Sequence, residues 1–158
     1  MVVARVNWAL EKCDSLGAVL AFGRSVAGWN RRSEPAGTRF NYNELCALTL
    51  GMVIRRATGG SLSTFAEQAL WQPLGAEASA TWFTDARGAE FNSIGFAARL
   101  RDWARLGQLV AHRGRGPDGR TIVSESWIRE CTSWREADAP VRHGRVRLAM
   151  GYKALFWH

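Results

Sequence analysis

The sequence has 158 residues, of which 47% are hydrophobic, and a formal net charge of +7 from 21 basic and 14 acidic residues. This length predicts one globular domain, and the hydrophobic fraction excludes an intrinsically disordered chain. No run of 18 apolar residues occurs, so the sequence indicates no transmembrane helix. The N-terminal residues lack the basic start and apolar core of a signal peptide, and we therefore expect a cytoplasmic protein.

All but two of the basic residues are arginines, and they are scattered along the chain. No zinc-finger spacing and no RNA-binding aromatic motif accompanies them, so we do not expect nucleic acid to be a partner. Three cysteines stand at unrelated spacings, which predicts neither a metal site nor a disulfide framework. Cys46 falls within an apolar helical pattern and is predicted to be a buried, reduced thiol.

Residues 1–34 carry only a loose helical pattern, whereas the signals sharpen from Pro35 onward. Apolar residues at three- and four-residue steps predict a helix that begins after Asn43, its N-cap, and ends at about Thr58. Apolar residues also occupy the other faces of this helix. We therefore predict that the helix is buried on most of its sides.

A second helix is predicted from about Ser61, its N-cap, to Leu70. Residues 80–84 alternate as in a strand, and residues 85–88 are typical of a hairpin turn. A third helix is predicted from about Arg99 to His112, with one inward apolar stripe made of Leu100, Trp103, Ala104, Gly107 and Val110.

Asp102 and Arg105 are three residues apart on this third helix and are predicted to pair on its exposed side. Residues 114–119 read as a loop, and residues 120–123 as a short strand. Ser124 is predicted to cap a last helix that ends at about Cys131. Residues 151–157 are typical of the beginning of a strand.

Six short motifs follow one another in an order and at separations that are similar to those of one enzyme family. They are Pro35 to Tyr42, the nine-residue step from Tyr42 to Gly51, residues 56–59, residues 70–75, residues 100–107 and residues 119–127. The chain resembles the serine β-lactamase-like hydrolases, above all the branch of 6-aminohexanoate-dimer hydrolases and carboxylesterases. The resemblance covers residues 35–157 and is weak over residues 1–34.

The resemblance implies an α+β fold. The chain would comprise mostly the helical domain of a β-lactamase/transpeptidase-like fold, with short hairpins and the start of a sheet strand. Intact relatives are about twice as long as this chain, so residues 1–158 are expected to form a single partial domain of a truncated hydrolase. Such enzymes hydrolyse small amides or esters through an acyl-serine and need neither a metal nor a cofactor.

By family position Tyr42 would relay the proton of the nucleophilic serine. The alternative is that Tyr42 only packs its ring under the start of the helix. Glu44 stands where relatives carry Asn or Ser against the nucleophile or substrate, so it is a candidate substrate-binding residue. The family's nucleophile lies in a Ser-x-x-Lys motif. The only lysines, Lys12 and Lys153, follow an alanine and a methionine at that spacing.

The sequence therefore predicts a piece of a serine hydrolase that is inactive on its own. One alternative is a non-catalytic interaction module, since a helical domain without its cover exposes apolar surface that binds a protein partner or promotes self-association. The other alternative is one half of a split hydrolase, whose other half supplies Ser-x-x-Lys.

Overall fold

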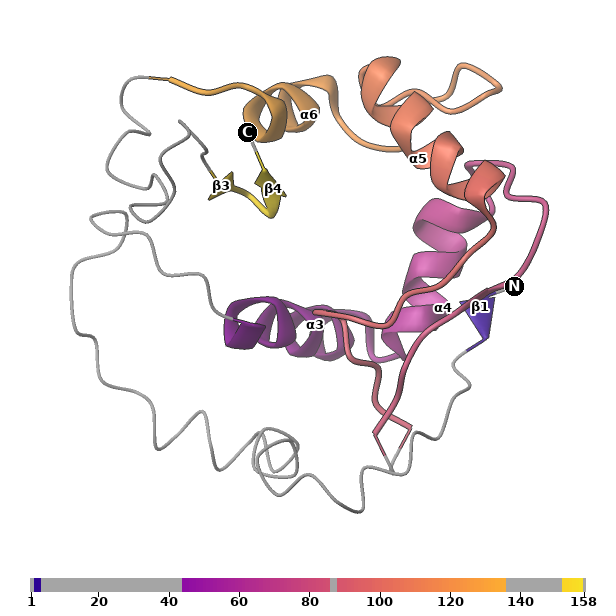
Figure 1. Cartoon of the computed structure of the whole chain (residues 1–158), viewed down its shortest axis with the longest axis vertical. Helices are drawn as coiled ribbons and strands as arrows, with labels where there is room; N and C mark the ends of the chain where they lie inside the picture. Colours follow the sequence, from indigo (N-terminus) through magenta and orange to yellow (C-terminus); the bar gives the residue numbers. More distant parts are fainter. Residues whose placement is uncertain (1, 4–43, 86–87, 136–151, 158) are drawn as a thin grey trace.

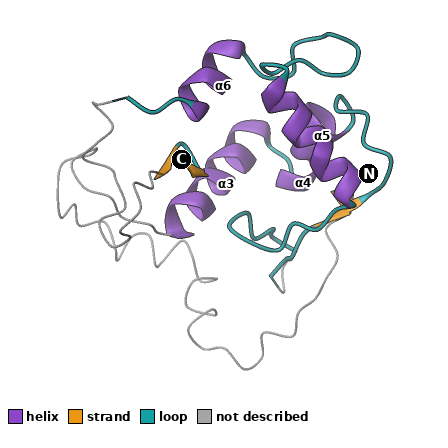
Figure 2. Cartoon of the chain, turned by 45° about the horizontal axis from the view of Figure 1, so that its top comes forward, coloured by secondary structure: helices purple, strands orange, loops and turns teal. Residues whose placement is uncertain are grey.

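The structure is a computed structural model that describes residues 2–3, 44–85, 88–135 and 152–157 (Figure 1). Within these ranges helices predominate and the strands are short, as Figure 2 shows. The described architecture is compatible with the predicted α+β class. No described helix is long and apolar enough to cross a membrane.

Helix α3 (Glu44–Thr58) ends close to its predicted boundary. Gly59 follows it at a φ of +69°, and its N–H donates to the carbonyl oxygen of Arg55 at 3.0 Å. A left-handed residue of this kind closes a helix most easily when it is glycine. The predicted N-cap, Asn43, lies outside the described residues.

The second predicted helix is confirmed as α4 (Leu62–Ala66), which continues into the π-helical turn η1 (Glu67–Trp71). Ser61 is its N-cap, because the serine hydroxyl accepts a hydrogen bond from the N–H of Thr64 at 3.0 Å. The side chain of Trp71 is buried, and its indole N–H donates to the carbonyl oxygen of Ala78 at 2.8 Å.

The predicted burial of α3 is wrong for the described side chains. Leu50, Met52 and Val53 are all exposed, and Gly51 is the buried residue in the middle of the helix. Cys46 is likewise an exposed free thiol, not a buried one. A helix that is apolar on every face gives no sequence signal for which face is covered, and here the described contacts cover one side only.

Strand β1 (Val2–Val3) pairs in parallel with β2 (Ala80–Thr81). Beyond β2 the chain turns back on itself, with antiparallel bridges between Thr81 and Ala97 and between Thr84 and Glu90. The hairpin predicted for this region is confirmed, although its regular strand is shorter than residues 80–84. Residues 86–87, within the predicted turn, lie outside the described ranges.

Helix α5 (Leu100–Ala111) confirms the third predicted helix, with Arg99 and His112 as its caps. Its predicted inward stripe is wrong, since Leu100 is 85% exposed and Trp103 is 43% exposed. The buried residues of α5 are Asp102 and Leu109. Apolar spacing indicates a helix, but it does not decide which side of the helix faces the core. Another side can be buried instead when its polar side chain is fully hydrogen-bonded.

Asp102 is that polar group. It pairs with Arg105 at 2.7 Å as predicted, but it lies inside the protein and not on an exposed side. Its two carboxylate oxygens accept the backbone N–H groups of Glu77 at 2.9 Å and Ala78 at 3.3 Å. These bonds connect the segment after η1 to α5, which explains why a carboxylate is buried here.

Four aromatic rings form a cluster beside Ala80. Phe96 makes edge-to-face contacts with Trp71, Trp82 and Trp103, at centroid distances of 5.0 to 5.4 Å. Contacts of this geometry are favourable because the positive ring edge meets the negative face of the next ring. Trp71, Trp82 and Phe96 also pack around Ala80 together with Leu106 of α5, so this core joins η1, the segment after β2 and α5.

Helix α6 (Glu125–Thr132) is capped by Ser124 as predicted. Strands β3 (Tyr152–Lys153) and β4 (Phe156–Trp157) form an antiparallel hairpin, so the single strand predicted over residues 151–157 is wrong. The turn residues Ala154 and Leu155 both have positive φ, and no Gly or Asn there indicated such a turn. Lys153 connects this hairpin to α6, with its Nζ 2.9 Å from Glu130 Oε1.

Candidate functional site

Two site residues, Tyr42 and Glu44, are predicted from the sequence, and both lie near residue 44, where the description of this part of the chain begins. Tyr42 lies outside the described residues. Glu44 is the first residue of α3. Helical periodicity places position 44 in line with Leu48, Gly51 and Arg55, which follow at steps of four, three and four residues. The structure describes a pocket along that line.

This pocket has a volume of about 190 Å³ and lies between α3 and the segment 85–92. Apolar side chains make most of its wall, and Arg55, Asp85, Glu90 and Asn92 add polar groups. An apolar pocket with a few convergent polar groups is the usual form of a small-molecule site. We therefore take it as the candidate functional site.

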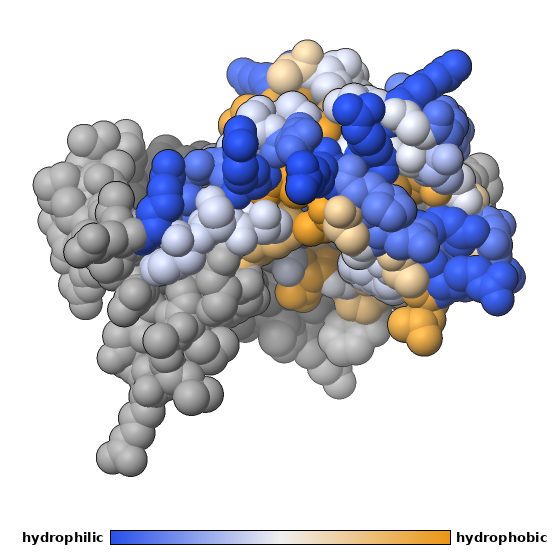
Figure 3. Space-filling model, turned by 90° about the horizontal axis from the view of Figure 1, so that it is seen from above, coloured by the Kyte–Doolittle hydropathy of each residue, from blue (hydrophilic) through white to orange (hydrophobic). Residues whose placement is uncertain are grey.

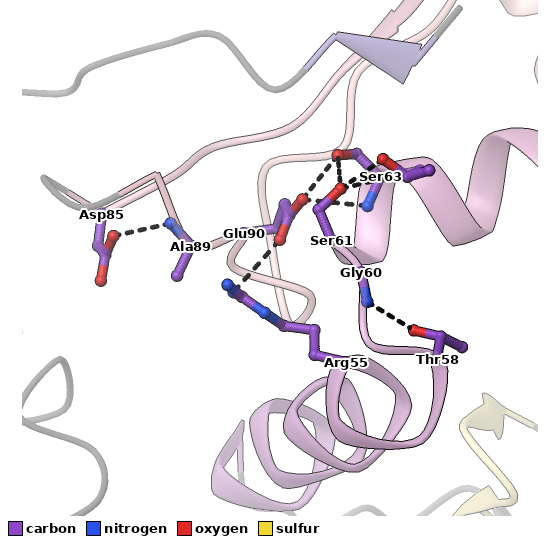
Figure 4. A network of polar contacts seen from close by, with 9 residues as sticks. Arg55, Thr58, Gly60, Ser61, Ser63, Asp85, Ala89 and Glu90 are labelled. Carbon is purple, nitrogen blue, oxygen red and sulfur yellow. Dashed lines mark hydrogen bonds and ion pairs between the residues drawn. The ribbon is translucent and has the colours of Figure 1, made fainter.

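The carboxylate of Glu90 lies at the centre of the polar contacts in Figure 4. It accepts hydrogen bonds from the hydroxyl of Ser63 at 2.6 Å and from the N–H of Ser63 at 3.0 Å. Its second oxygen is 3.4 Å from a guanidinium nitrogen of Arg55. These three contacts join α3, the start of α4 and the hairpin segment at one buried point.

The pKa of Glu90 is lower than the ordinary value of 4.5. Burial raises this pKa, but the hydrogen bonds from Ser63, the backbone N–H of Glu90 and the positive charge of Arg55 together lower it by more. Glu90 is therefore a carboxylate near neutral pH. Because its oxygens are occupied by Ser63 and Arg55, its role in this arrangement is to hold the pocket wall and not to act as a general base.

Asn92 closes the pocket against the first half of α3. Its side-chain amide donates a hydrogen bond to the carbonyl oxygen of Ala47. The same amide lies directly beside Gly51, where an added Cβ would come within 2.5 Å of Asn92 Oδ1. Glycine at position 51 is what lets the amide approach the helix backbone.

Arg55 is the polar group of the pocket that can contact a ligand. Its side chain is 39% exposed, and one of its nitrogens pairs with Glu90. A guanidinium has five N–H donors, so further donors remain for a carbonyl or carboxylate oxygen. No group of three or more His, Cys, Asp or Glu residues that could hold a metal ion occurs in the described part of the chain.

Sequence reasoning did not identify the residues that shape this pocket. Ser63, Glu90 and Asn92 belong to no catalytic motif, and they are 27 to 45 residues from the groups they contact. Gly51 is part of a family spacing, and a glycine inside a predicted helix is the one signal in the sequence of such a close approach.

The comparisons with known proteins agree with this architecture. The chain is 29% identical over 159 aligned residues to the 6-aminohexanoate-dimer hydrolase of Paenarthrobacter ureafaciens. Its structure superposes with a TM-score of 0.69 on that of a Bacillus anthracis protein assigned as a 6-aminohexanoate-dimer hydrolase, also 29% identical. The matches cover 88% and 80% of this chain. No protein-family model matches it.

The fold and the order of the motifs thus resemble those of the β-lactamase-like hydrolases. More particularly, the chain resembles the 6-aminohexanoate-dimer hydrolases in both sequence and structure, which confirms the predicted resemblance. The chain spans 39% of the length of the curated relative and 32% of that of the solved one.

Proposed function

We propose that this chain carries the tyrosine-bearing part of a β-lactamase-like serine hydrolase that acts on a small amide or ester. The similarity to 6-aminohexanoate-dimer hydrolases over most of the chain, in sequence and in fold, is the observation that supports this function. In this proposal residues 1–158 form one partial domain, family-like over residues 35–157, that consists mostly of the helical part of the fold. A cytoplasmic location stays a prediction.

Tyr42 is the proposed proton relay. It would take the proton of an attacking serine and deliver it to the leaving amine or alcohol. In the sequence Tyr42 stands two residues before α3, and Leu48, which lines the pocket, follows one helical turn after the start of that helix, which supports this role. Glu44 is the proposed substrate contact at the same end of the helix.

We further propose that the 158-residue chain alone does not form an acyl-serine. The nucleophile of this superfamily is the serine of Ser-x-x-Lys, which its lysine activates. Ala9 and Met150 occupy the serine positions before Lys12 and Lys153. A tyrosine without that serine and lysine has no proton to relay.

Intact-mass spectrometry of the purified chain, after incubation with a fluorophosphonate and with an activated ester, tests this proposal. We expect an unmodified mass under conditions that label a complete serine hydrolase fully. A single stoichiometric adduct that Tyr42→Phe abolishes would show that another serine has become the nucleophile, and the proposed inactivity would be wrong.

The alternative of a split hydrolase has its own test. The part of the Paenarthrobacter ureafaciens relative that this chain does not match is mixed with the chain, and ester hydrolysis is followed. Activity that requires both components and is lost with Tyr42→Phe would favour the split enzyme. Absence of activity from a folded mixture would favour the third possibility, a non-catalytic interaction module. The exposed apolar residues of α3 are the observation that favours such a module.

A further inference from the structure

A second pocket lies beside the C-terminal half of α5, outside the candidate functional site. Its volume is about 210 Å³, and it shares no lining residue with the pocket between α3 and residues 85–92. Two buried leucines, Leu74 and Leu109, form part of its wall. The loop that follows α5 folds back beside the end of the helix and forms another part (Figure 1). We call this cavity the α5 pocket.

Backbone contacts fix the loop that lines the α5 pocket. The N–H of Gly114 donates to the carbonyl oxygen of Leu109 at 2.8 Å, and the N–H of Gly116 donates to that of Arg120 at 2.9 Å. An added Cβ at Gly116 would come within 2.8 Å of Ile122 Cδ1, so glycine is needed for this close approach. The loop is closed on itself and against α5, and its pocket residues are held in place before a ligand binds.

The polar side chains that line the α5 pocket are hydrogen-bond donors. Arg105, Gln108 and His112 follow one another on one side of α5 at steps of three and four residues, and Arg115 lines the pocket from the loop. Guanidinium and amide groups both supply N–H donors, and an imidazole supplies at least one. No Asp or Glu is among the lining residues. The pocket therefore suits a ligand whose polar atoms are acceptors.

Arg115 supplies the charge of the α5 pocket. Its guanidinium donates to the carbonyl oxygen of Gly119 at 3.3 Å, and it forms no ion pair within the described ranges. The nearby Arg113, in contrast, pairs with Glu125 at 3.2 Å. The end of α5 adds little negative charge, because the N–H groups of residues 112–114 occupy its last carbonyl oxygens. A positive charge therefore remains for an anionic group of a ligand.

The other arginine of the pocket does not add to this charge. Arg105 is 2.7 Å from a carboxylate oxygen of Asp102 and 2.5 Å from one of Glu77. Arg101 is 3.8 Å from the same oxygen of Glu77. Two guanidinium groups and two carboxylates balance each other at this end of the pocket. We therefore expect the anionic group of a ligand to lie at Arg115 and not at Arg105.

The apolar part of the wall and the volume decide what else the ligand carries. Leu74, Leu109 and Pro117 line the pocket beside its donors. Figure 3 shows one side of the described surface, where hydrophobic areas likewise lie between hydrophilic side chains. An inorganic anion has no apolar part to cover such a wall. A protein cavity of about 150 Å³ is large enough for benzene, so the α5 pocket has room for a ring with one small substituent.

We propose that the α5 pocket binds a small carboxylate whose body is an aromatic ring or a branched chain of similar size. The carboxylate pairs with Arg115 and accepts further hydrogen bonds from Gln108 and His112. The ring or chain contacts the apolar part of the wall and is removed from water there. The proposal goes beyond the hydrolase function and does not depend on it.

Benzoate titrated into the isotope-labelled full chain tests this proposal by two-dimensional NMR. The buffer contains roughly 0.15 M salt, which screens long-range attraction to the net charge of +7. We expect saturable shifts of the backbone amides of His112, Arg115 and Gly116. Benzamide has the same ring without the charge. It is expected to bind roughly tenfold more weakly, because it lacks the charge-assisted hydrogen bonds.

One charge-removing variant and a matched control locate the carboxylate. Arg115→Gln is expected to weaken benzoate binding roughly tenfold and to leave benzamide binding unchanged. Arg113→Gln makes the same change of charge two residues away, at an exposed side chain outside the pocket lining, and is expected to leave benzoate binding unchanged. Far-UV circular dichroism confirms that both variants keep their helices. Because no step measures hydrolysis, failure of this proposal is distinct from failure of the proposed function.

Four outcomes would overturn the proposal. The first is no saturable binding of benzoate by the folded chain. The second is equal binding of benzamide and benzoate, which would show that the carboxylate is not recognised. The third is equal loss with Arg113→Gln and Arg115→Gln, which would indicate a general effect of charge. The fourth is inorganic phosphate shifting the same amides at concentrations as low as benzoate does, which would show that the apolar wall plays no part.

Discussion

The side-chain amide of Asn92 occupies the space beside Gly51 where any other residue would carry its Cβ. An added Cβ would lie 2.5 Å from Asn92 Oδ1 and 2.8 Å from Asn92 Cγ. The amide cannot simply rotate away, because its nitrogen also donates a hydrogen bond to the carbonyl oxygen of Ala47. This contact holds the segment after the hairpin against α3 and forms one end of the pocket.

We therefore expect Gly51→Ala to destabilise the protein. Overpacking costs about 1–3 kcal/mol, and the better helix propensity of alanine returns up to about 1 kcal/mol. Urea denaturation followed by circular dichroism measures the difference. Gly107→Ala is the matched control, because Gly107 also lies inside a helix but has nothing within 4 Å of an added Cβ. We expect that control to stabilise the protein by up to about 1 kcal/mol. Equal effects at the two positions would contradict the proposed contact.

Glu90 and Ser63 are expected to be energetically coupled. Hydrogen bonds to a charged group contribute about 1.5–3 kcal/mol, and the hydroxyl of Ser63 donates to the buried carboxylate of Glu90 at 2.6 Å. A double-mutant cycle with Ser63→Ala and Glu90→Gln measures the coupling in the free energy of unfolding. Effects that add without coupling would mean that the two side chains do not interact as described.

The stability of the protein is expected to fall in acid. Burial raises the pKa of Glu90, but the hydrogen bonds from Ser63, the backbone N–H of Glu90 and the charge of Arg55 together hold this pKa below its ordinary 4.5. The backbone N–H of Glu77 is the largest cause that holds the pKa of Asp102 below its ordinary 3.8. Both carboxyl groups bind a proton more weakly in the folded state than in the unfolded state. Their contribution is therefore complete above pH 4.5 and is lost as the pH falls through the lowered folded-state values.

Urea midpoints measured from neutral pH downward check this expectation. Glu90→Gln should lower the urea midpoint at neutral pH and make the loss of stability in acid shallower, since it removes one of the carboxyl groups whose pKa is lowered by folding. If the urea midpoint of this variant falls with pH as steeply as that of the unmodified chain, Glu90 is not a source of the pH dependence.

The two described cysteines should differ in reactivity. Cys46 is exposed, whereas Cys131 is buried in α6, and burial together with the charge of Glu130 raises the pKa of the Cys131 thiol. Only the thiolate reacts with iodoacetamide, so Cys46 should be alkylated roughly tenfold faster or more in the native protein. Peptide mapping by mass spectrometry distinguishes the sites, and in denaturant the two rates should converge. Preferential labelling of Cys131 in the native protein would contradict its buried position.

The local elements of this fold were largely predictable from the sequence. Ser61 and Ser124 both cap helices as predicted, because an N-cap is decided by one side chain and the N–H groups two or three residues ahead. The bounds of α5 followed from apolar spacing over one continuous segment. The β3–β4 hairpin was not predictable, since Ala154 and Leu155 adopt positive φ without the Gly or Asn that usually signals it.

The sequence by itself determined the helices, their caps and the relationship to β-lactamase-like hydrolases, because each of these depends on short stretches of neighbouring residues. Only the tertiary structure decided which helix faces are buried. It placed Asp102 inside and Leu100 outside, and it left Leu50 and Val53 of an apolar helix exposed. It also brought Ser63, Glu90 and Arg55 to one point from separate segments. Burial depends on which distant segments meet a helix face, and no local spacing contains that information.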